Sequence, residues 1–337
     1  NTRELKKMVD EILVDLNSSF IIDDEEFQIT TSIGVAIYPD DGIDSTSLIR
    51  KAEVAMNKAK ESSANRPIIF NNALDTEVQE YFWMKNDLAR ALSNDELFLN
   101  YQPIYDTSID KLIGVEALIR WRHKEKGIIL PTEFIPLAER SGMIHPIGDW
   151  VLFNACKQNK KWQDRGYEPV YISVNVSVLQ LEQPGFCRVV EEMLKETGLE
   201  PEYLQLEITE TYFIQKYDSI KDTINELSQL GVRLAIDDFG TGYSSLSQLC
   251  TFDVNNIKID KTFIDGIERD LNKSKIVKAL ISLAESLNIS LTAEGVETQE
   301  QLIFLKKNKC TVAQGFLFSE PVDPDGIERM LAKYKGI

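Results

Sequence analysis

Apolar runs and amphipathic segments alternate along most of this 337-residue chain. After residue 96, eight apolar runs of strand length recur, and segments with apolar residues at helical spacing separate most of them. Eight strands alternating with helices over about 240 residues are the pattern of a (β/α)8 barrel, so we predict an α/β fold with a TIM-like barrel. A doubly wound sheet would need a glycine-rich phosphate loop after its first strand, and none follows here. The predicted strands are Leu97–Ile104, Leu112–Trp121, Val170–Val176, Leu204–Ile208, Val232–Asp237, Asn256–Ile259, Ser290–Ala293 and Thr311–Gln314.

A smaller α/β segment, residues 1–71, precedes the predicted barrel. Its second half predicts an amphipathic helix over Ser45–Ser62 and a short strand, Ile68–Phe70. Residues 72–93 contain no glycine or proline and predict a connecting helix, and residues 94–337 form the predicted barrel domain. The first half predicts a helix over Leu5–Leu16 and a hairpin of Phe20–Ile22 and Phe27–Tyr38 around an acidic turn at Asp23–Glu26.

The charge balance of the chain is strongly acidic. Lys and Arg total 37 and Asp and Glu total 54, which gives a net charge of −17. This charge argues against binding to duplex nucleic acid or to an anionic membrane surface. A small anionic substrate stays compatible with it if some of the carboxylates hold metal cations.

Other classes are excluded by what the sequence lacks. No run of 18 apolar residues occurs, so we expect no membrane contact from this chain itself and a cytoplasmic location, with any membrane anchor upstream. The four cysteines are widely spaced and there are only two histidines, His123 and His145. This argues against a zinc site, a disulfide framework and a His-dependent catalytic triad.

Polar side chains stand at or near the ends of the predicted barrel strands. In a barrel of this type these strand ends converge on one mouth, where the active site lies. Glu116 alone would more often be an outward, solvated residue and Lys258 alone a surface lysine, but solvated positions do not explain the joint pattern. Several carboxylates facing one another repel, and hard cations with oxygen ligands, Mg²⁺ or Mn²⁺, remove that repulsion. Two such ions are the usual machinery for in-line displacement at phosphorus. The polar residues are Glu116, Asn175, Glu207, Asp237, Asp238, Lys258, Asp260, Glu294 and Gln314.

The same residues lie in ordered motifs of a known family. The motifs are Tyr101–Pro103, Glu116–Leu118 (EAL), Pro131–Gly142, Asn175–Ser177, Leu206–Glu210, Asp237–Ser245 (DDFGTGYSS), Ile257–Asp260 (IKID), Glu294–Thr298 (EGVET) and Gln314–Gly315. Through them residues 96–337 resemble the EAL family of cyclic di-GMP phosphodiesterases. The resemblance implies a TIM-like barrel that hydrolyses cyclic di-GMP to linear pGpG with two Mg²⁺ or Mn²⁺ ions.

The resemblance, taken together with ligand chemistry, implies roles for individual residues. Lys258 would hydrogen-bond the attacking water, Glu294 would accept its proton, and Asp238 completes the catalytic set. Glu297 would anchor the loop Asp238–Ser245, which in the family couples metal binding to a dimer interface, so a homodimer through the barrel is implied. Ca²⁺ is expected to bind and to inhibit. The implied metal ligands are Glu116, Asn175, Glu207 and Asp237 for one ion, and Asp237, Asp238 and Glu294 for the other. The implied substrate-binding residues are Gln102, Leu118, Arg120, Asp260 and Gln314.

Residues 1–71 resemble the C-terminal part of a GGDEF domain, the diguanylate cyclase fold, through Ser32–Pro39 and Ala52–Lys60. The family's glycine-rich loop is missing, and Asp24–Phe27 lacks the glycines that let backbone N–H groups approach a phosphate. Further family positions are altered at Glu53, at Asn57 and near Ser62. We therefore expect a partial or degenerate GGDEF fragment that makes no cyclic di-GMP.

Two other function classes stay open at this point. The first is a catalytically weak or inactive cyclic di-GMP receptor, whose sign would be a lost metal ligand, and none is lost here. The second is another metal-dependent barrel enzyme, such as a lyase or a glycosidase with paired carboxylates. An assay for pGpG with cyclic di-GMP and Mg²⁺ or Mn²⁺ separates these classes from the phosphodiesterase.

Overall fold

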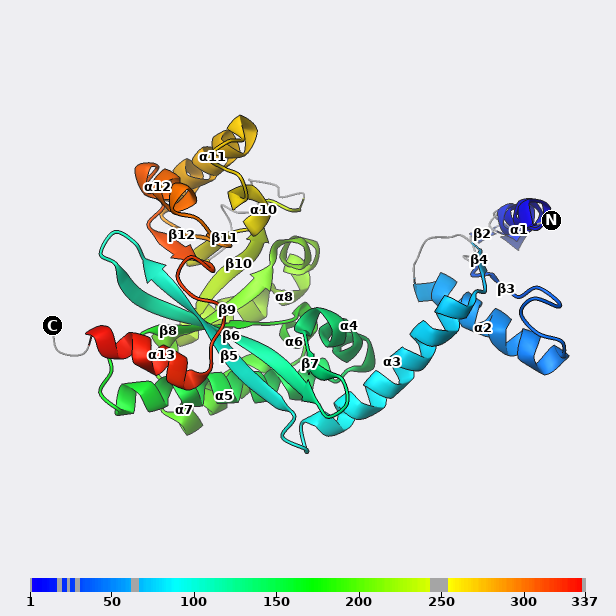
Figure 1. Cartoon of the computed structure of the whole chain (residues 1–337), viewed down its shortest axis with the longest axis horizontal. Coiled ribbons are helices and arrows are strands. Elements are labelled where there is room, and N and C mark those ends of the chain that lie inside the picture. The colour runs from blue at the N-terminus through cyan, green and yellow to red at the C-terminus, as the bar shows by residue number, and fades with distance from the viewer. Residues whose placement is uncertain are drawn as a thin grey trace. The chain divides into compact units, whose positions relative to one another are not determined.

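A computed structural model describes residues 2–16, 20–22, 25–27, 31–61, 67–242 and 254–334 of the chain (Figure 1). The chain divides into two compact units, Asn1–Asp87 and Leu88–Ile337. Helix α3, Asn72–Ala91, matches the predicted connecting helix in position, and its last turns bury Leu88 and Ala91. The domain boundaries at residues 71 and 93 stay predictions.

The first unit is a small α/β arrangement. Strand β3 pairs in parallel with β4, and helix α2 crosses β3 so closely that a Cβ on Gly34 would lie 2.1 Å from the Ala52 carbonyl oxygen. Glycine is therefore required where the helix meets the strand. The elements are α1 (Thr2–Leu16), β1 (Phe20–Ile22), β2 (Glu25–Phe27), β3 (Gly34–Val35), α2 (Ser45–Glu61) and β4 (Ile68–Ile69).

The predicted hairpin of this unit is only partly right. β1 and β2 pair antiparallel with Phe20 opposite Phe27, but β2 already contains Glu25, so the predicted turn at Asp23–Glu26 is too long. The predicted strand Phe27–Tyr38 is wrong as one element, because β3 covers only Gly34–Val35 and the chain then turns. The Asp41 carboxylate accepts a hydrogen bond from the Ile37 N–H at 2.6 Å, which stabilises that turn.

Eight of the described strands of the second unit close into a barrel, which confirms the predicted TIM-like fold. Seven run parallel, whereas β5 is antiparallel to both of its neighbours, β6 and β13. Only residues 107–110 link β5 to β6, and a connection this short allows a hairpin but no parallel crossover. β7 (Gly127–Ile129) adds to the edge of β6. The barrel strands are β5 (Leu97–Asp106), β6 (Lys111–His123), β8 (Tyr171–Asn175), β9 (Leu204–Thr209), β10 (Arg233–Phe239), β11 (Asn256–Ile259), β12 (Ser290–Ala293) and β13 (Val312–Gln314).

Helices cover the outside of the barrel (Figure 1). Apolar side chains of the strands pack against them, as Ile259 and Ala293 do with Val277 and Leu305 of the neighbouring helices. None of the described helices is long and apolar enough to cross a membrane. The helices are α4 (Pro131–Ser141), α5 (Ile144–Asp164), α6 (Val178–Leu181), α7 (Phe186–Thr197), η1 (Pro201–Tyr203), α8 (Glu210–Leu230), α10 (Lys261–Ile264), α11 (Leu271–Leu287), α12 (Gln299–Lys307), α13 (Pro324–Leu331) and η2 (Ala332–Tyr334).

The two-residue period of the strands sends polar side chains into the barrel. Along β9 the apolar Leu206 alternates with Gln205 and Glu207, and all three are buried. At the start of β8 the buried ring of Tyr171 packs directly over Gly114, where an added Cβ would lie 2.4 Å from the Tyr171 Cζ. Hydrophobic layers thus surround an interior that can hold charged groups only where they pair with one another.

Candidate active site

The ammonium group of Lys258 lies at the centre of a cluster of carboxylates inside the barrel. Its Nζ is 2.6 Å from Glu207 Oε2, 2.6 Å from Glu294 Oε1, 3.3 Å from Asp237 Oδ1 and 3.4 Å from Glu116 Oε2. The Lys258 side chain is only 1% exposed. The five residues therefore lie together, as the sequence analysis expected. In the structure Lys258 is the positive charge that balances the four carboxylates.

Amide side chains hold Glu116 in place from two sides. Asn175 Nδ2 donates to Glu116 Oε1 at 2.7 Å, and Gln314 Nε2 donates to Glu116 Oε2 at 2.6 Å. Gln314 Nε2 also donates to Gln102 Oε1 at 2.9 Å, which connects β13 to β5 across the seam of the barrel. Gln102 lies opposite Glu116 on β6, and four of the predicted residues, Gln102, Glu116, Asn175 and Gln314, form one hydrogen-bonded group.

The protonation states of the cluster follow from burial and from Lys258. Burial alone would lower the pKa of Lys258, but its four carboxylate neighbours raise that pKa well above its usual value. Burial raises the pKa of Glu207 to about 8, although Lys258 acts against this. Burial also acts to raise the pKa of Glu116, but Lys258 and the two amide donors outweigh it, so that pKa is lowered. The carboxylates thus favour the charged ammonium of Lys258, and their own acidities differ.

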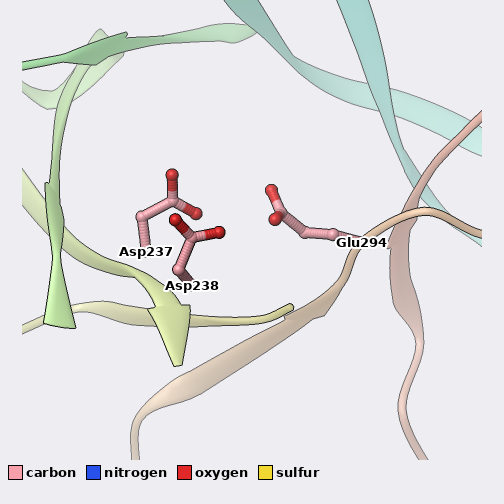
Figure 2. Close-up of side chains that lie close together, drawn as sticks. All are labelled: Asp237, Asp238 and Glu294. Carbon is pink, nitrogen blue, oxygen red and sulfur yellow. The ribbon is translucent and has the colours of Figure 1, made fainter. Parts of the chain in front are cut away.

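Three carboxylates form a second group beside Lys258. Oxygens of Asp237, Asp238 and Glu294 lie within 4.8 Å of one another, and Figure 2 shows the two aspartates side by side, facing Glu294. Successive strand residues normally point to opposite faces. Here β10 takes three steps from Ile236 to Phe239 while β11 takes two, and Asp238 has a φ of 53°. This bulge brings both aspartates to the same mouth.

The second group fits a divalent cation. Asp237 Oδ1 is buried and makes no hydrogen bond, and it lies 3.3 Å from the Lys258 ammonium. A divalent cation could supply the further contact that this buried oxygen lacks. Burial, with the charge of Asp237 and with Asp260, raises the pKa of Asp238 to about 6. Carboxylates that lie close together and repel one another are the donor set that hard cations such as Mg²⁺ and Mn²⁺ prefer. No ligand geometry is implied by the oxygens alone.

A pocket of about 260 Å³ opens above these groups. Five predicted site residues are among its lining: Gln102, Glu116, Asp237, Glu294 and Gln314. The described lining also includes Glu297, predicted as a loop anchor, and four residues to which the sequence analysis assigned no role in binding or catalysis. These four residues are Lys261, Gly295, Gly315 and Phe316.

Three predicted substrate-binding residues are not among the residues that line this pocket. Leu118 and Arg120 lie on β6, on the same face as Glu116 by the two-residue period, and Arg120 Nη1 donates to the Ile119 carbonyl at 2.8 Å. The Asp260 carboxylate accepts from the Thr262 N–H at 2.9 Å and so caps α10. Their contacts to a substrate stay predictions.

The loop that begins at Asp238 is held by Glu210 in its described part. Glu210 Oε2 accepts hydrogen bonds from the Gly240 N–H at 2.7 Å and from the Gly242 N–H at 3.1 Å. The implied anchor, Glu297, pairs with Lys261, which also lines the pocket. Its role as an anchor of the loop stays a prediction, because Tyr243–Ser245 lie outside the described residues.

Sequence missed Glu210 although it lies in the Leu206–Glu210 motif. It is the first residue of α8, where an acidic side chain is common for reasons of helix polarity alone. The signal that could have found it is its burial, since Glu210 is 1% exposed and a buried carboxylate needs donors. Burial of one helix residue could not be predicted from a single sequence.

Comparisons with known proteins agree with this geometry. Residues 85–321 match the family described as EAL domain, and residues 1–66 match the family described as diguanylate cyclase, GGDEF domain. The chain belongs to the EAL domain family. The barrel is therefore its EAL domain, preceded by a GGDEF fragment, as the motifs predicted.

A curated relative of the EAL chain is the cyclic di-GMP phosphodiesterase PdeR of Escherichia coli, 37% identical over 98% of this chain and 50% of PdeR. Among solved structures, the PaMucR phosphodiesterase in a c-di-GMP complex has a TM-score of 0.70 and 41% identity over 73% of this chain and 99% of that one. A calcium and cyclic di-GMP complex of Klebsiella pneumoniae BlrP1 has a TM-score of 0.61 and 28% identity, covering 67% and 56%. The chain spans half or less of the length of three curated relatives that it matches, PdeR among them.

Proposed function

We propose that this chain hydrolyses cyclic di-GMP to linear pGpG. The observation that carries the proposal is the cluster of Asp237, Asp238 and Glu294 next to the buried ammonium of Lys258, at the floor of a pocket in an EAL barrel. The names of PdeR and of the PaMucR complex support cyclic di-GMP as the substrate class. Hydrolysis of this messenger would lower its concentration.

The proposed cofactors are two Mg²⁺ or Mn²⁺ ions. Glu116, Asn175, Glu207 and Asp237 would hold one ion, and Asp237, Asp238 and Glu294 the other. Asn175 uses its NH₂ group on Glu116, so its amide oxygen is the atom available to a cation. When bound, the ions would activate a water and neutralise charge on the phosphate.

The remaining chemistry is assigned to side chains of the chain itself. Glu294 is assigned as the acceptor for the proton of the attacking water; burial raises its pKa well above the usual value, and Lys258 and a bound cation would act to keep the carboxylate ionised. Lys258 keeps its charge and would stabilise the negative charge that develops on the phosphoryl oxygens. Asp238 completes this group as a ligand and as an orienting neighbour of Asp237.

The substrate is held by uncharged and basic groups around the cluster. Gln102 and Gln314 are joined to each other and line the pocket, so they can position the dinucleotide beside Glu116. Leu118 and Arg120, which follow Glu116 on the same strand face, would extend the site, with Arg120 pairing a phosphate. Asp260 would contribute from the start of α10.

The assembly and location of the enzyme are also proposals. A homodimer through the barrel would couple the loop at Asp238 to the partner subunit. The free thiols of Cys156, Cys187 and Cys310 agree with action in the reducing cytoplasm. Ca²⁺ would bind without supporting turnover.

The test is incubation of the purified chain with cyclic di-GMP and Mg²⁺, followed by chromatographic separation of the products. The proposal predicts accumulation of pGpG that stops when EDTA is added. A chain that binds cyclic di-GMP but forms no pGpG with either Mg²⁺ or Mn²⁺ would be a receptor instead.

A further inference from the structure

Lys261 and Glu297 form an ion pair at the mouth of the active-site pocket. Lys261 Nζ contacts Glu297 Oε1, and the two side chains are 49% and 40% exposed. Both residues line the pocket, Lys261 from the first position of α10 and Glu297 from the segment before α12. The pair is therefore reachable by any molecule that enters the pocket, unlike Lys258, which is 1% exposed.

The backbone provides a dedicated place for the Lys261 side chain. Gly295 has a φ of +64°, and a Cβ added there would lie 2.4 Å from Lys261 Cγ. The aliphatic part of Lys261 thus lies directly over Gly295, next to Glu294 in the chain. Any other residue at position 295 would push the ammonium away from the mouth.

The position of Glu297 is fixed as well. Its backbone N–H donates to Gln301 Oε1 at 2.7 Å, and the same oxygen accepts from the Thr298 N–H at 3.0 Å, at the start of α12. The backbone of Glu297 is thus held in place at the start of α12, whereas the flexible stem of Lys261 lets its ammonium move. An ion pair this exposed contributes little to stability, so exchanging its partner costs little.

The charge of the pocket lining makes the role of Lys261 specific. Among the described residues that line the pocket, four are acidic, Glu116, Asp237, Glu294 and Glu297, and Lys261 is the basic one. Cyclic di-GMP carries two phosphodiester groups, and only one can lie at the metal cluster during cleavage. The second must stay in an acidic pocket, where it requires a cation that can reach it.

We propose that Lys261 binds the phosphodiester that is not being cleaved, and that Glu297 is the resting partner that Lys261 leaves when substrate enters. This inference rests on the proposed function, since it takes cyclic di-GMP as the ligand. It makes Lys261 a substrate-binding residue and gives Glu297 the role of a competitor for its charge. The chemistry required is an ammonium–phosphate contact, which Lys provides as a mobile point charge.

The experiment compares Lys261→Met, Lys261→Arg and the control Lys195→Met. Lys195 pairs with Glu191 on α7, an exposed ion pair of the same kind that does not line the pocket. Affinity for cyclic di-GMP is measured calorimetrically in Ca²⁺, so that it does not depend on turnover. Lys261→Met should weaken binding about tenfold, as expected for loss of one charged hydrogen bond. Lys261→Arg and Lys195→Met should bind nearly as wild type does.

A substrate with a single phosphodiester separates this role from damage to the cluster. Turnover of bis(p-nitrophenyl) phosphate in Mg²⁺ should be the same in Lys261→Met and wild type, because this substrate has no second phosphate. Unchanged cyclic di-GMP affinity in Lys261→Met, or an equal loss with both substrates, overturns the Lys261 proposal. The two proposals can fail separately. If wild type binds cyclic di-GMP more tightly than Lys261→Met does but makes no pGpG, the proposed hydrolysis is overturned and the role of Lys261 is supported.

Discussion

Lys258 Nζ and Glu207 Oε2 are 2.6 Å apart in the interior of the barrel, where the two side chains are 1% and 0% exposed. Neither group can turn to water, so the Lys258 ammonium depends on Glu207 and its other carboxylate neighbours for its charge, while burial raises the pKa of Glu207 to about 8 in spite of Lys258. Both come from neighbouring parts of the same parallel sheet, β11 and β9, with β10 between them. Loss of this ion pair should therefore affect both the stability of the barrel and the charge of its active site.

The first prediction is that Lys258→Met destabilises the chain as well as inactivating it. Breaking a buried ion pair by removing one partner costs about 3–5 kcal/mol, because carboxylates are left unpaired. The measurement is the free energy of unfolding in urea, with EDTA present so that no cation replaces the ammonium. Lys261→Met, at the exposed mouth, should unfold at nearly the wild-type urea concentration. Equal unfolding of wild type and Lys258→Met would show that the cluster is not held together by Lys258.

The second prediction concerns the loop that follows β10. Glu210→Gln should lower turnover by at least about tenfold, because the two amides of Gly240 and Gly242 lose a charged acceptor worth roughly 1.5–3 kcal/mol each and the loop next to Asp238 is released. Hydrogen exchange at Gly240 and Gly242 should quicken in this variant. Glu192→Gln, on the surface of α7, serves as the control.

Glu297→Gln distinguishes the two candidate anchors. It should leave hydrogen exchange at Gly240 and Gly242 as in wild type, because Glu297 pairs with Lys261. If hydrogen exchange at these two amides quickens in Glu297→Gln and stays unchanged in Glu210→Gln, the anchor of the loop is Glu297 and not Glu210.

The third prediction is that the chain forms no cyclic di-GMP from GTP. The GGDEF fragment lacks the glycine-rich loop that would let backbone N–H groups surround a phosphate. Purified protein is incubated with GTP and Mg²⁺ in the Glu116→Gln background, so that any product would survive. Detection of cyclic di-GMP above a protein-free control would show that the fragment is a working cyclase.

The fold was predictable because its signals are local. Buried parallel strands are short apolar runs, and each of the eight was found within a few residues of its bounds. The reversed direction of β5 follows from the four-residue link at 107–110. The apolar runs predict where strands lie but not their direction, so the reversal was not predicted. The predicted strand Phe27–Tyr38 shares only Phe27 with β2 and contains β3, because its β-branched and apolar residues gave no sign of where the pairing ends.

The site was predictable as a set of residues but not as an arrangement. Strand ends in a barrel meet at one mouth, so Glu116, Glu207, Asp237 and Glu294 could be placed together before any coordinates. The bulge that turns Asp237 and Asp238 to the same side depends on a positive φ at a residue other than glycine, which has no sequence signal of its own. The partner of Glu297 depends on the packing of Lys261 over Gly295.

The fourth prediction is that Ca²⁺ supports cyclic di-GMP binding with little or no turnover. Ca²⁺–oxygen distances are roughly 2.3–2.6 Å, against about 2.0–2.1 Å for Mg²⁺. The oxygens of Asp237, Asp238 and Glu294 should accept both ions, but the larger ion changes the spacing on which two-metal displacement depends. The measurement is pGpG formation in Mg²⁺ with rising Ca²⁺, which should show competitive inhibition. Rates in Ca²⁺ alone that equal those in Mg²⁺ would mean that the ions only position the substrate.

The central claim is that the carboxylate cluster around Lys258 performs the hydrolysis, and one paired measurement tests it most directly. Wild type and Glu116→Gln are compared for pGpG formation in Mg²⁺ and for cyclic di-GMP binding in Ca²⁺. Glutamine keeps the size of Glu116 and can still accept a hydrogen bond from one of the two amide donors, Gln314 or Asn175, but it removes the charge that would hold a cation. The account predicts that Glu116→Gln still binds cyclic di-GMP and forms pGpG at least about a hundredfold more slowly, the order of magnitude of losing one preorganised charged group. Formation of pGpG by Glu116→Gln at the wild-type rate would contradict the account.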